Sequence, residues 1–152
     1  SDCPNELHRI AIDFSTDSLE QKLSSVTGTG PVIVVIEGVF MYLEEDTIRQ
    51  LLATLRKMFP QHKLICDLMT RKFFQKYGRQ IHEKLTGMGA AFKFTAAHPD
   101  ALFLSSGYER VNWFSMIEKS LEYESRKIPK FLLKTLLRTL GTGYAIYVFE
   151  TL

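Results

Sequence analysis

The chain has 152 residues, of which 45% are hydrophobic, 12% aromatic and 24% charged, and its formal net charge at pH 7 is +2. This composition is typical of one globular domain; it excludes a disordered chain, gives no argument for nucleic acid and contains no apolar run as long as a membrane span. Residues 1–10 lack the pattern of a secretory signal, and the two cysteines, Cys3 and Cys66, are too few for a disulfide framework, so a reducing cytoplasm is expected.

Residues 9–12 predict a short strand that is followed by a helix. Asp17 offers an acceptor side chain at the N-cap position and Glu20 stands three residues later, which is the pattern of a capping box. The glycines and the proline of residues 28–31 end this helix.

Residues 32–36 form an unbroken β-branched run, Val-Ile-Val-Val-Ile. A strand that is apolar on both faces is typical of the centre of a parallel sheet with helices on each side. An apolar stripe then predicts an amphipathic helix that ends at Pro60, and residues 63–67 predict the next strand, so that the three elements form a right-handed βαβ unit. The stripe consists of Ile48, Leu51, Leu52, Leu55, Met58 and Phe59.

The second half of the chain continues the alternation of helices and strands, and the predicted fold class is therefore α/β. A helical insert at about residues 115–141 separates the last two strands. Its basic residues predict a solvated helix face, with a lid on the ligand side or a membrane-surface helix as alternatives. The other predicted elements are a helix over 71–85 with a kink near Gly78, a helix over 100–106 closed by Gly107, and strands over 109–114 and 144–150. The basic residues are Arg126, Lys127, Lys130, Lys134 and Arg138.

Carboxylates follow three successive predicted strands, and ligands of open parallel sheets bind beyond the carboxyl ends of the strands. The three residues are Asp13, Glu37 and Asp67, and the alternative for Asp67 is a loop or helix-capping acid. Glu37 is the strongest candidate because it is joined to five apolar residues, and an unpaired buried charge costs several kcal/mol. Gly38 beside it permits the close approach of a ligand.

Other kinds of site lack their sequence patterns. The glycine pairs at 28–30, 87–89 and 141–143 follow helices or precede strands, whereas a phosphate-binding loop must follow a strand and open a helix. The four histidines have no partner at metal-ligand spacing, so no metal is expected. Neither a hydrolase triad nor a nicotinamide fingerprint is visible.

Residues 37–43, Glu-Gly-Val-Phe-Met-Tyr-Leu, resemble the leucine carboxyl methyltransferase family together with the strand before them and the helix after them. This family includes the O-methyltransferases of polyketide synthesis and depends on S-adenosylmethionine. Residues 11–17 are similar to the end of the family's preceding strand. The likeness is specific from His8 to Thr70 and weaker from His98 to Leu152, where the last two strands look like the family's closing antiparallel pair.

The resemblance implies roles for five residues. Asp13 and Phe14 would hold the adenine of S-adenosylmethionine, and Glu37, next to Gly38, would contact the methionyl end. Tyr42 would face the substrate. The methyl group would go to a carboxylate or hydroxyl oxygen of a small molecule or of a protein C terminus, and the resemblance identifies no catalytic base.

The resemblance also implies a Rossmann-like class I methyltransferase sheet. The family's first strand, its Gly-x-Gly loop and its second strand should precede His8, and they have no counterpart in this sequence. Residues 1–152 therefore look like a single domain that is the C-terminal part of a methyltransferase domain, without its first two strands. We expect this chain alone to bind S-adenosylmethionine weakly or not at all, and its open sheet edges to pair with another chain, such as a second copy. The alternative function is a non-catalytic α/β interaction domain in which Glu37 is structural.

Overall fold

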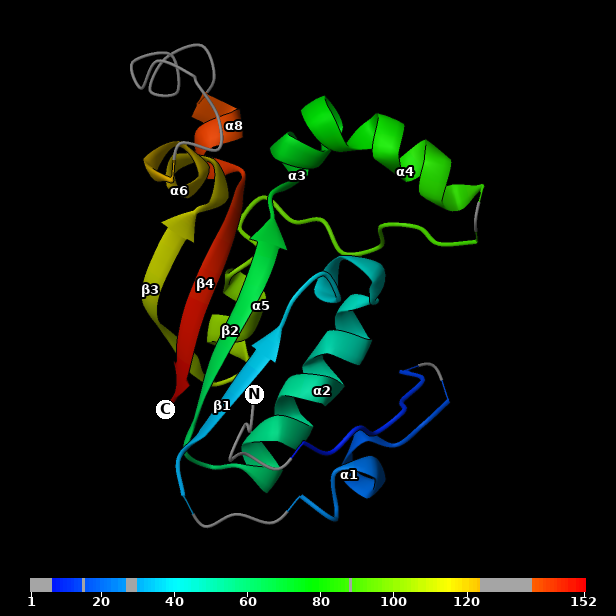
Figure 1. Cartoon of the computed structure of the whole chain (residues 1–152), viewed down its shortest axis with the longest axis vertical. Coiled ribbons are helices and arrows are strands. Elements are labelled where there is room, and N and C mark those ends of the chain that lie inside the picture. Colours follow the sequence, from blue (N-terminus) through cyan, green and yellow to red (C-terminus); the bar gives the residue numbers. More distant parts are fainter. Residues whose placement is uncertain (1–6, 15, 27–29, 88, 124–137) are drawn as a thin grey trace.

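The computed structural model describes residues 7–14, 16–26, 30–87, 89–123 and 138–152. These residues form an α/β fold around a four-stranded mixed sheet with the strand order β1-β2-β4-β3 (Figure 1). β1 and β2 are parallel, and β4 is antiparallel to both of its neighbours, so the predicted closing antiparallel pair is confirmed. The strands are β1 (Val32–Ile36), β2 (His62–Met69), β3 (Tyr108–Ser115) and β4 (Tyr144–Thr151).

The helices connect these strands, and α3, α4, α6 and α8 lie beyond the carboxyl end of β2 (Figure 1). The predicted kink near Gly78 is confirmed, because a π-helical turn, η2, separates α3 from α4. None of the helices in the described ranges is long and apolar enough to cross a membrane. The helical elements are α1 (Leu19–Lys22), the 3-10 turn η1 (Phe40–Tyr42), α2 (Glu45–Met58), α3 (Arg71–Phe73), η2 (Phe74–Gly78), α4 (Arg79–Thr86), α5 (Ala101–Ser105), α6 (Met116–Glu122) and α8 (Arg138–Thr142).

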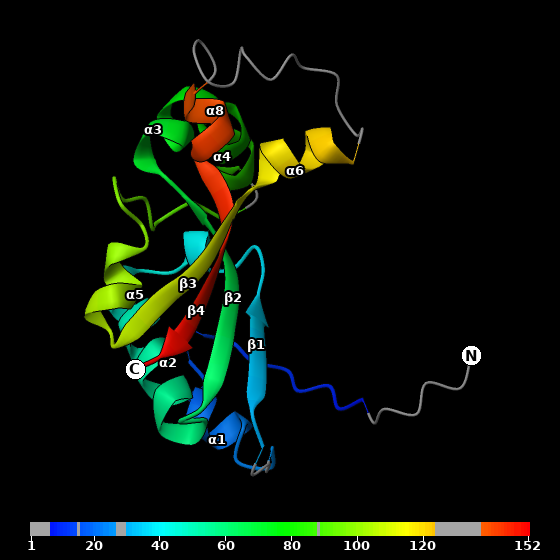
Figure 2. The same cartoon turned by 90° about the vertical axis from the view of Figure 1, so that its left-hand side faces the viewer.

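α2 and α5 cover one face of the sheet, and the core lies between them and the strands (Figure 2). The predicted stripe of α2 is confirmed by the buried side chains of Ile48, Leu52 and Leu55. On α5, Phe103 stacks on Phe149 of β4 with ring centroids 4.7 Å apart. Because leucine and phenylalanine side chains bury large apolar areas, this layer supplies most of the hydrophobic stabilisation.

The opposite face of the sheet is open along β1. Ile33 and Val35 are 66% and 64% exposed, and no helix of the described ranges covers them. The expectation that residues 32–36 form a central strand covered on both faces is therefore wrong. β1 is an edge strand with one hydrogen-bonded neighbour, β2, and one layer of helices. We call this uncovered side of the sheet the open face.

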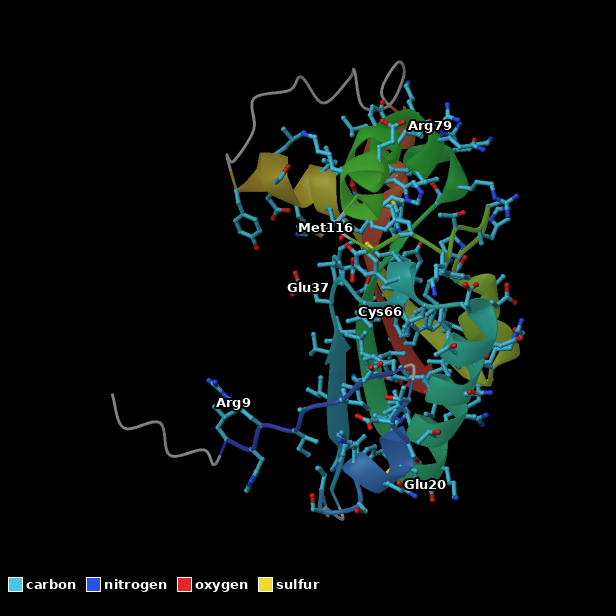
Figure 3. All side chains as sticks on the ribbon, turned by 90° about the vertical axis from the view of Figure 1, so that its right-hand side faces the viewer. Arg9, Glu20, Glu37, Cys66, Arg79 and Met116 are labelled. Carbon is cyan, nitrogen blue, oxygen red and sulfur yellow. The ribbon has the colours of Figure 1, made fainter. Side chains whose placement is uncertain are left out.

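Residues 7–13 form no strand, and the strand expected over residues 9–12 is wrong. No neighbouring strand pairs with this segment, and Arg9 lies well away from the sheet (Figure 3). Four residues, of which three are apolar, are too short a pattern to specify a strand without such a partner.

The capping box that was expected to begin with Asp17 is shifted by one residue. Ser18 is the N-cap of α1, and its side chain accepts a hydrogen bond from the amide of Gln21 at 3.4 Å. Oδ2 of Asp17 instead accepts from the amide of Asp13 at 2.9 Å. Asp17 therefore stabilises the turn that precedes the helix.

The predicted insert includes α6 and α8. Arg138 is exposed at the start of α8. The other four basic residues of the predicted charged face lie outside the described residues; they are Arg126, Lys127, Lys130 and Lys134.

Candidate functional site

The carboxyl ends of β1 and β2 meet the amino end of β4 beside a small cavity. The antiparallel register places Met69, at the end of β2, opposite Tyr144 at the start of β4. The cavity has a volume of about 70 Å³, and we call it the carboxyl-edge cavity. It is lined by Val35, Ile36, Glu37, Ile65, Cys66, Asp67, Met116, Tyr144 and Ile146.

Glu37 directly follows β1 and projects from the open face of the sheet (Figure 3). Its side chain is exposed, and its carboxylate is not found in any ion pair that the described residues form. The residue therefore offers a negatively charged group to the cavity. The place of Glu37 at the end of β1 agrees with the prediction from the sequence. The expectation that its charge is buried is wrong, because β1 is uncovered on this face and the side chain is exposed.

Asp67 is the second carboxylate of the cavity and is only 4% exposed. Its Oδ1 accepts a hydrogen bond from the amide of Gly38 at 2.7 Å, and its Oδ2 accepts one from the hydroxyl of Tyr144 at 2.6 Å. Both oxygens thus have a donor, as a buried carboxylate requires. Of the two carboxylates, Glu37 is the one that remains available to a ligand.

Tyr144 is bound tightly into this cluster. Burial raises the pKa of the phenol, and the hydrogen bond to Asp67 and the negative charges of Asp67 and Glu37 raise it further. The phenol therefore stays protonated at neutral pH and donates a hydrogen bond to Asp67. Its oxygen keeps a lone pair that can accept a hydrogen bond from a ligand.

Cys66 also lines the cavity but is buried. Burial and, to a lesser extent, the charge of Asp67 raise the pKa of its thiol well above the ordinary value. Since the thiolate is the reactive form, Cys66 is not an activated nucleophile. The described residues also contain no group of three or more His, Cys, Asp or Glu side chains that could hold a metal ion.

Tyr42 lies next to the cavity without lining it. The side chain belongs to the turn η1 and packs against Phe92 with ring centroids 5.3 Å apart. Tyr42 also contributes to the raised pKa of Tyr144, as the smallest of the causes, so the two side chains are close enough to interact electrostatically. The place of Tyr42 is thus compatible with a group beside the ligand, and its role toward a substrate stays a prediction.

Asp13 and Phe14 do not line the carboxyl-edge cavity. Phe14 packs against the core and lines a separate hollow of about 180 Å³ beside α2, together with Thr47 and Leu51. The carbonyl of Asp13 accepts hydrogen bonds in the turn before α1, among them one from the amide of Asp17 at 2.8 Å. The adenine-binding role of this pair stays a prediction.

The sequence analysis missed Tyr144 and Met116 as residues of the site. Tyr144 begins the last strand, and an antiparallel strand brings its amino end to the carboxyl ends of its parallel neighbours. The prediction covered only the pairing of the last two strands with each other, whereas the place of Tyr144 depends on the pairing of β4 with β2. Met116 begins α6, and its place depends on where the insert leaves β3.

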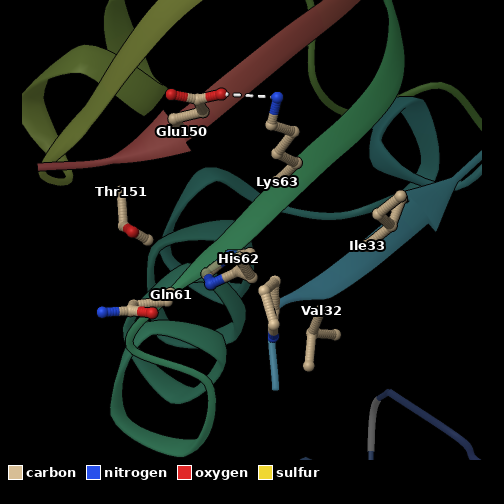
Figure 4. Close-up of a pocket in the computed structure, with 8 residues that line it drawn as sticks. Val32, Ile33, Gln61, His62, Lys63, Glu150 and Thr151 are labelled. Atoms are coloured by element: carbon tan, nitrogen blue, oxygen red, sulfur yellow. Dashed lines mark ion pairs between the residues drawn. The ribbon is translucent and has the colours of Figure 1, made fainter.

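A larger hollow of about 510 Å³ lies at the other end of the sheet (Figure 4). Its two charged side chains neutralise each other, since Nζ of Lys63 is 2.8 Å from Oε1 of Glu150. It lies at the amino ends of β1 and β2, whereas ligands of open α/β sheets bind beyond the carboxyl ends. The carboxyl-edge cavity is therefore the better candidate in spite of its smaller size.

The fold is similar to that of a DUF574 family protein from Streptomyces avermitilis, with a TM-score of 0.56 and 14% identity over 82% of this chain and 45% of that chain. This likeness confirms the α/β sheet architecture. Two more distant matches are methyltransferases. Geranyl diphosphate C-methyltransferase from Streptomyces coelicolor matches with a TM-score of 0.49 and 10% identity over 79% of this chain and 46% of that chain. Magnesium protoporphyrin IX methyltransferase from Synechocystis matches with a TM-score of 0.44 and 9% identity over 79% of this chain and 44% of that chain. The chain spans about half the length of these structures.

Residues 1–56 match the family model of leucine carboxyl methyltransferase. The matched segment contains Glu37, Gly38 and Tyr42, so the resemblance that the sequence predicted is confirmed for this part of the chain. It ends before Thr70, where the sequence analysis placed the limit of specific similarity. No curated protein matches the sequence.

Proposed function

We propose that this chain is part of an S-adenosylmethionine-dependent O-methyltransferase whose carboxyl-edge cavity receives the methionyl end of the cofactor. The observation that carries the proposal is the free carboxylate of Glu37 at this cavity, within the segment that matches the family model. A carboxylate in this place can bind an α-ammonium group through a charge-assisted hydrogen bond.

The residues of the cavity fit one end of the cofactor. A volume of about 70 Å³ corresponds to roughly two water molecules at about 30 Å³ each, whereas pockets for whole ligands measure about 300–1,000 Å³. The acceptor oxygens of Glu37 and Tyr144 suit an ammonium group, and the apolar side chains of Ile65 and Met116 suit a methylene chain. By the family resemblance, the adenine would lie at Asp13 and Phe14.

S-Adenosylmethionine, when bound, supplies a methyl group on a positively charged sulfur. The residues of this chain act mainly by positioning: Glu37 holds the ammonium group, and Tyr42 lies on the side of the acceptor. In-line alignment can contribute up to roughly 7–11 kcal/mol to lowering the barrier. A carboxylate acceptor needs no base, whereas a hydroxyl acceptor would need one.

The site is open on the side from which Glu37 projects. Val35, which lines the cavity, belongs to the exposed row of β1 on the same face of the sheet. A further polypeptide segment or a second copy that packs on this row would cover it and complete the cavity, and the free edge of β1 can add a strand beside it. Unpaired N–H and C=O groups of an edge strand favour such an addition. We therefore expect the 152-residue chain alone to bind S-adenosylmethionine weakly or not at all.

The test of the proposed function is transfer of an isotopically labelled methyl group from S-adenosylmethionine by the protein that carries this chain in its host. Glu37→Ala is expected to abolish transfer while circular dichroism shows a retained fold. Glu83→Ala, which removes an exposed carboxylate from α4, is the matched control and should leave transfer unchanged. Absence of transfer to carboxylic acids, to alcohols and to protein C termini would contradict the proposal.

The completeness of the site is tested separately by calorimetric titration of the chain alone. Binding of S-adenosylmethionine in the micromolar range would show that no further segment is required. Binding that appears only in the millimolar range, or not at all, is the expected result.

A non-catalytic interaction domain is the second candidate, and the exposed row of Ile33 and Val35 favours it. In that case the open face is the functional surface and Glu37 has a structural role. The two candidates differ in the methyl-transfer experiment, since the interaction domain transfers no methyl group to any acceptor. For both, we propose a cytoplasmic location, in line with the free, buried thiol of Cys66.

A further inference from the structure

Gly38 occupies a backbone conformation that glycine adopts readily and other residues rarely do. Its φ angle is +65°, and an added Cβ would have no atom within 4 Å. The glycine is thus required by the left-handed conformation of the turn after β1 and not by lack of space. Because glycine has the greatest backbone freedom of all residues, a hydrogen bond to this turn restricts it to one orientation.

Asp67 provides that partner. The hydrogen bond from the amide of Gly38 to Oδ1 of Asp67 fixes the plane of the peptide that joins Glu37 to Gly38. This peptide includes the carbonyl carbon of Glu37, and the direction of the Cα–Cβ bond follows from the positions of this carbon, Cα and the amide nitrogen. By holding the peptide, the hydrogen bond therefore helps to hold the direction in which the Glu37 side chain leaves the backbone. Asp67 is nearly fully buried on the neighbouring strand, so it is a rigid support.

Tyr144 in turn holds Asp67. The hydroxyl of Tyr144 donates to Oδ2 at 2.6 Å from the strand on the other side of β2. The cluster therefore links the carboxyl ends of β1 and β2 to the amino end of β4 through one carboxylate. It also occupies both oxygens of Asp67, so that the cavity presents a single free carboxylate.

We propose that Asp67 is the positioning residue for Glu37 and that the hydroxyl of Tyr144 fixes Asp67 for this task. The site then presents one oriented carboxylate to one cationic group, such as the α-ammonium of the methionyl end. This inference rests on the proposed function where it names the ligand. The arrangement of Asp67, Gly38 and Tyr144 itself is open to a test without ligand.

The first experiment measures the Gly38 amide by NMR in the 152-residue chain. Asp67→Ala is expected to raise its hydrogen-exchange rate by about 10-fold or more, because a hydrogen bond to a charged group is lost. Asp67→Asn keeps an acceptor oxygen and should retain most of the protection of the Gly38 amide from exchange. This variant keeps the experiment informative if Asp67→Ala does not fold. Tyr123→Phe, which removes the hydroxyl of a side chain that is 75% exposed, is the control and should not change the Gly38 amide.

The chemical shift of the same amide separates positioning from general loosening. Tyr144→Phe removes one donor from Asp67, so more negative charge remains on the oxygen that binds Gly38, and the Gly38 amide proton should move downfield. A loosened turn would move it upfield. An upfield shift in Tyr144→Phe, or unchanged Gly38 exchange in Asp67→Ala, would overturn the inference.

The second experiment uses the methyl-transfer assay of the host protein. Asp67→Ala is expected to raise the KM for S-adenosylmethionine by about 10-fold and to leave kcat within about 3-fold, because the ligand-binding carboxylate loses its orientation. If Glu37→Ala abolishes transfer and Asp67→Ala leaves KM unchanged, the positioning role is wrong and the proposed function stands. If the wild-type protein transfers no methyl group, the proposed function is wrong, and the NMR measurements still decide the role of Asp67.

Discussion

Nε2 of His62 lies 3.0 Å from the hydroxyl of Tyr108, and both side chains are buried on the helix-covered face of the sheet. Nδ1 of the same ring lies 2.6 Å from the carbonyl oxygen of Phe59. Because a carbonyl oxygen only accepts, we assign the ring proton to Nδ1. Nε2 is then an acceptor, and it shares the Tyr108 hydroxyl proton with the carbonyl oxygen of Leu52, which lies 3.3 Å from the hydroxyl. This polar pair connects the amino end of β2 to β3 across the intervening strand β4.

Tyr108→Phe should lower the free energy of unfolding by about 1–3 kcal/mol, because Nε2 of His62 is left buried without a donor. Urea denaturation followed by circular dichroism measures the change. Tyr123→Phe removes the same hydroxyl from a side chain that is 75% exposed and should leave the midpoint unchanged. Equal midpoints for both variants would mean that the buried pair contributes nothing to stability.

Gly38→Ala should destabilise the chain by about 1–2 kcal/mol, which is the cost of a left-handed conformation for a residue with a Cβ. Gly38→Asn should cost less, since asparagine tolerates this conformation better. Gly30→Ala is the control: the added Cβ also meets no atom within 4 Å, and Gly30 has no positive φ angle. Thermal unfolding of the three variants would contradict the argument if Gly30→Ala were the most destabilised.

The raised pKa of Tyr144 predicts a loss of stability in alkali. Above the ordinary tyrosine pKa of about 10, the unfolded chain releases a proton that the folded chain keeps. The contribution of Tyr144 is therefore complete below about pH 10 and falls as the pH rises, by at most about 1.4 kcal/mol per pH unit. Urea midpoints at about pH 9 and about pH 11 should differ less in Tyr144→Phe than in the wild-type chain. An identical difference would show that Tyr144 titrates normally.

Replacing Ile33 and Val35 by lysine should reduce self-association without loss of the fold, because the two positions form the exposed apolar row of an edge strand. Analytical ultracentrifugation over a range of concentrations measures the change. Leu104→Lys, at an exposed position of α5, is the control and should leave association unchanged. A wild-type chain that stays monomeric at the highest concentration would contradict the proposed pairing of this edge.

The helix-covered side of the fold could be predicted well from the sequence. The stripe of Ile48, Leu52 and Leu55 defined both the extent of α2 and the face that it buries, because a period of 3.6 residues is specific to a helix. The bounds of β1 were also correct. The prediction that helices cover both faces of β1 was wrong. A run of apolar residues shows that each face of the strand could be buried, but it does not show whether a second layer of helices is present.

The candidate site was predictable only in part. Glu37 follows β1, whereas Asp67 lies within β2, which extends to Met69 and not only to residue 67 as expected. A short crossover makes the two strands parallel, so the neighbourhood of the two carboxylates follows from local sequence. Asp13 was grouped with them on the basis of a strand that does not form. The place of Tyr144 in the site depends on the pairing of β4 with β2, two strands that are far apart in the sequence, and no local pattern determines the register of this pairing.

The strand order has a consequence for how the chain is synthesised. β4 is the last of the four strands to leave the ribosome, yet it lies between two strands that are made before it. During translation, β2 and β3 therefore have a vacant place between them, and Asp67 has no Tyr144 to bind until β4 emerges. A slow folding step after the emergence of β4, and a need for protection by a chaperone until then, would follow from this topology alone.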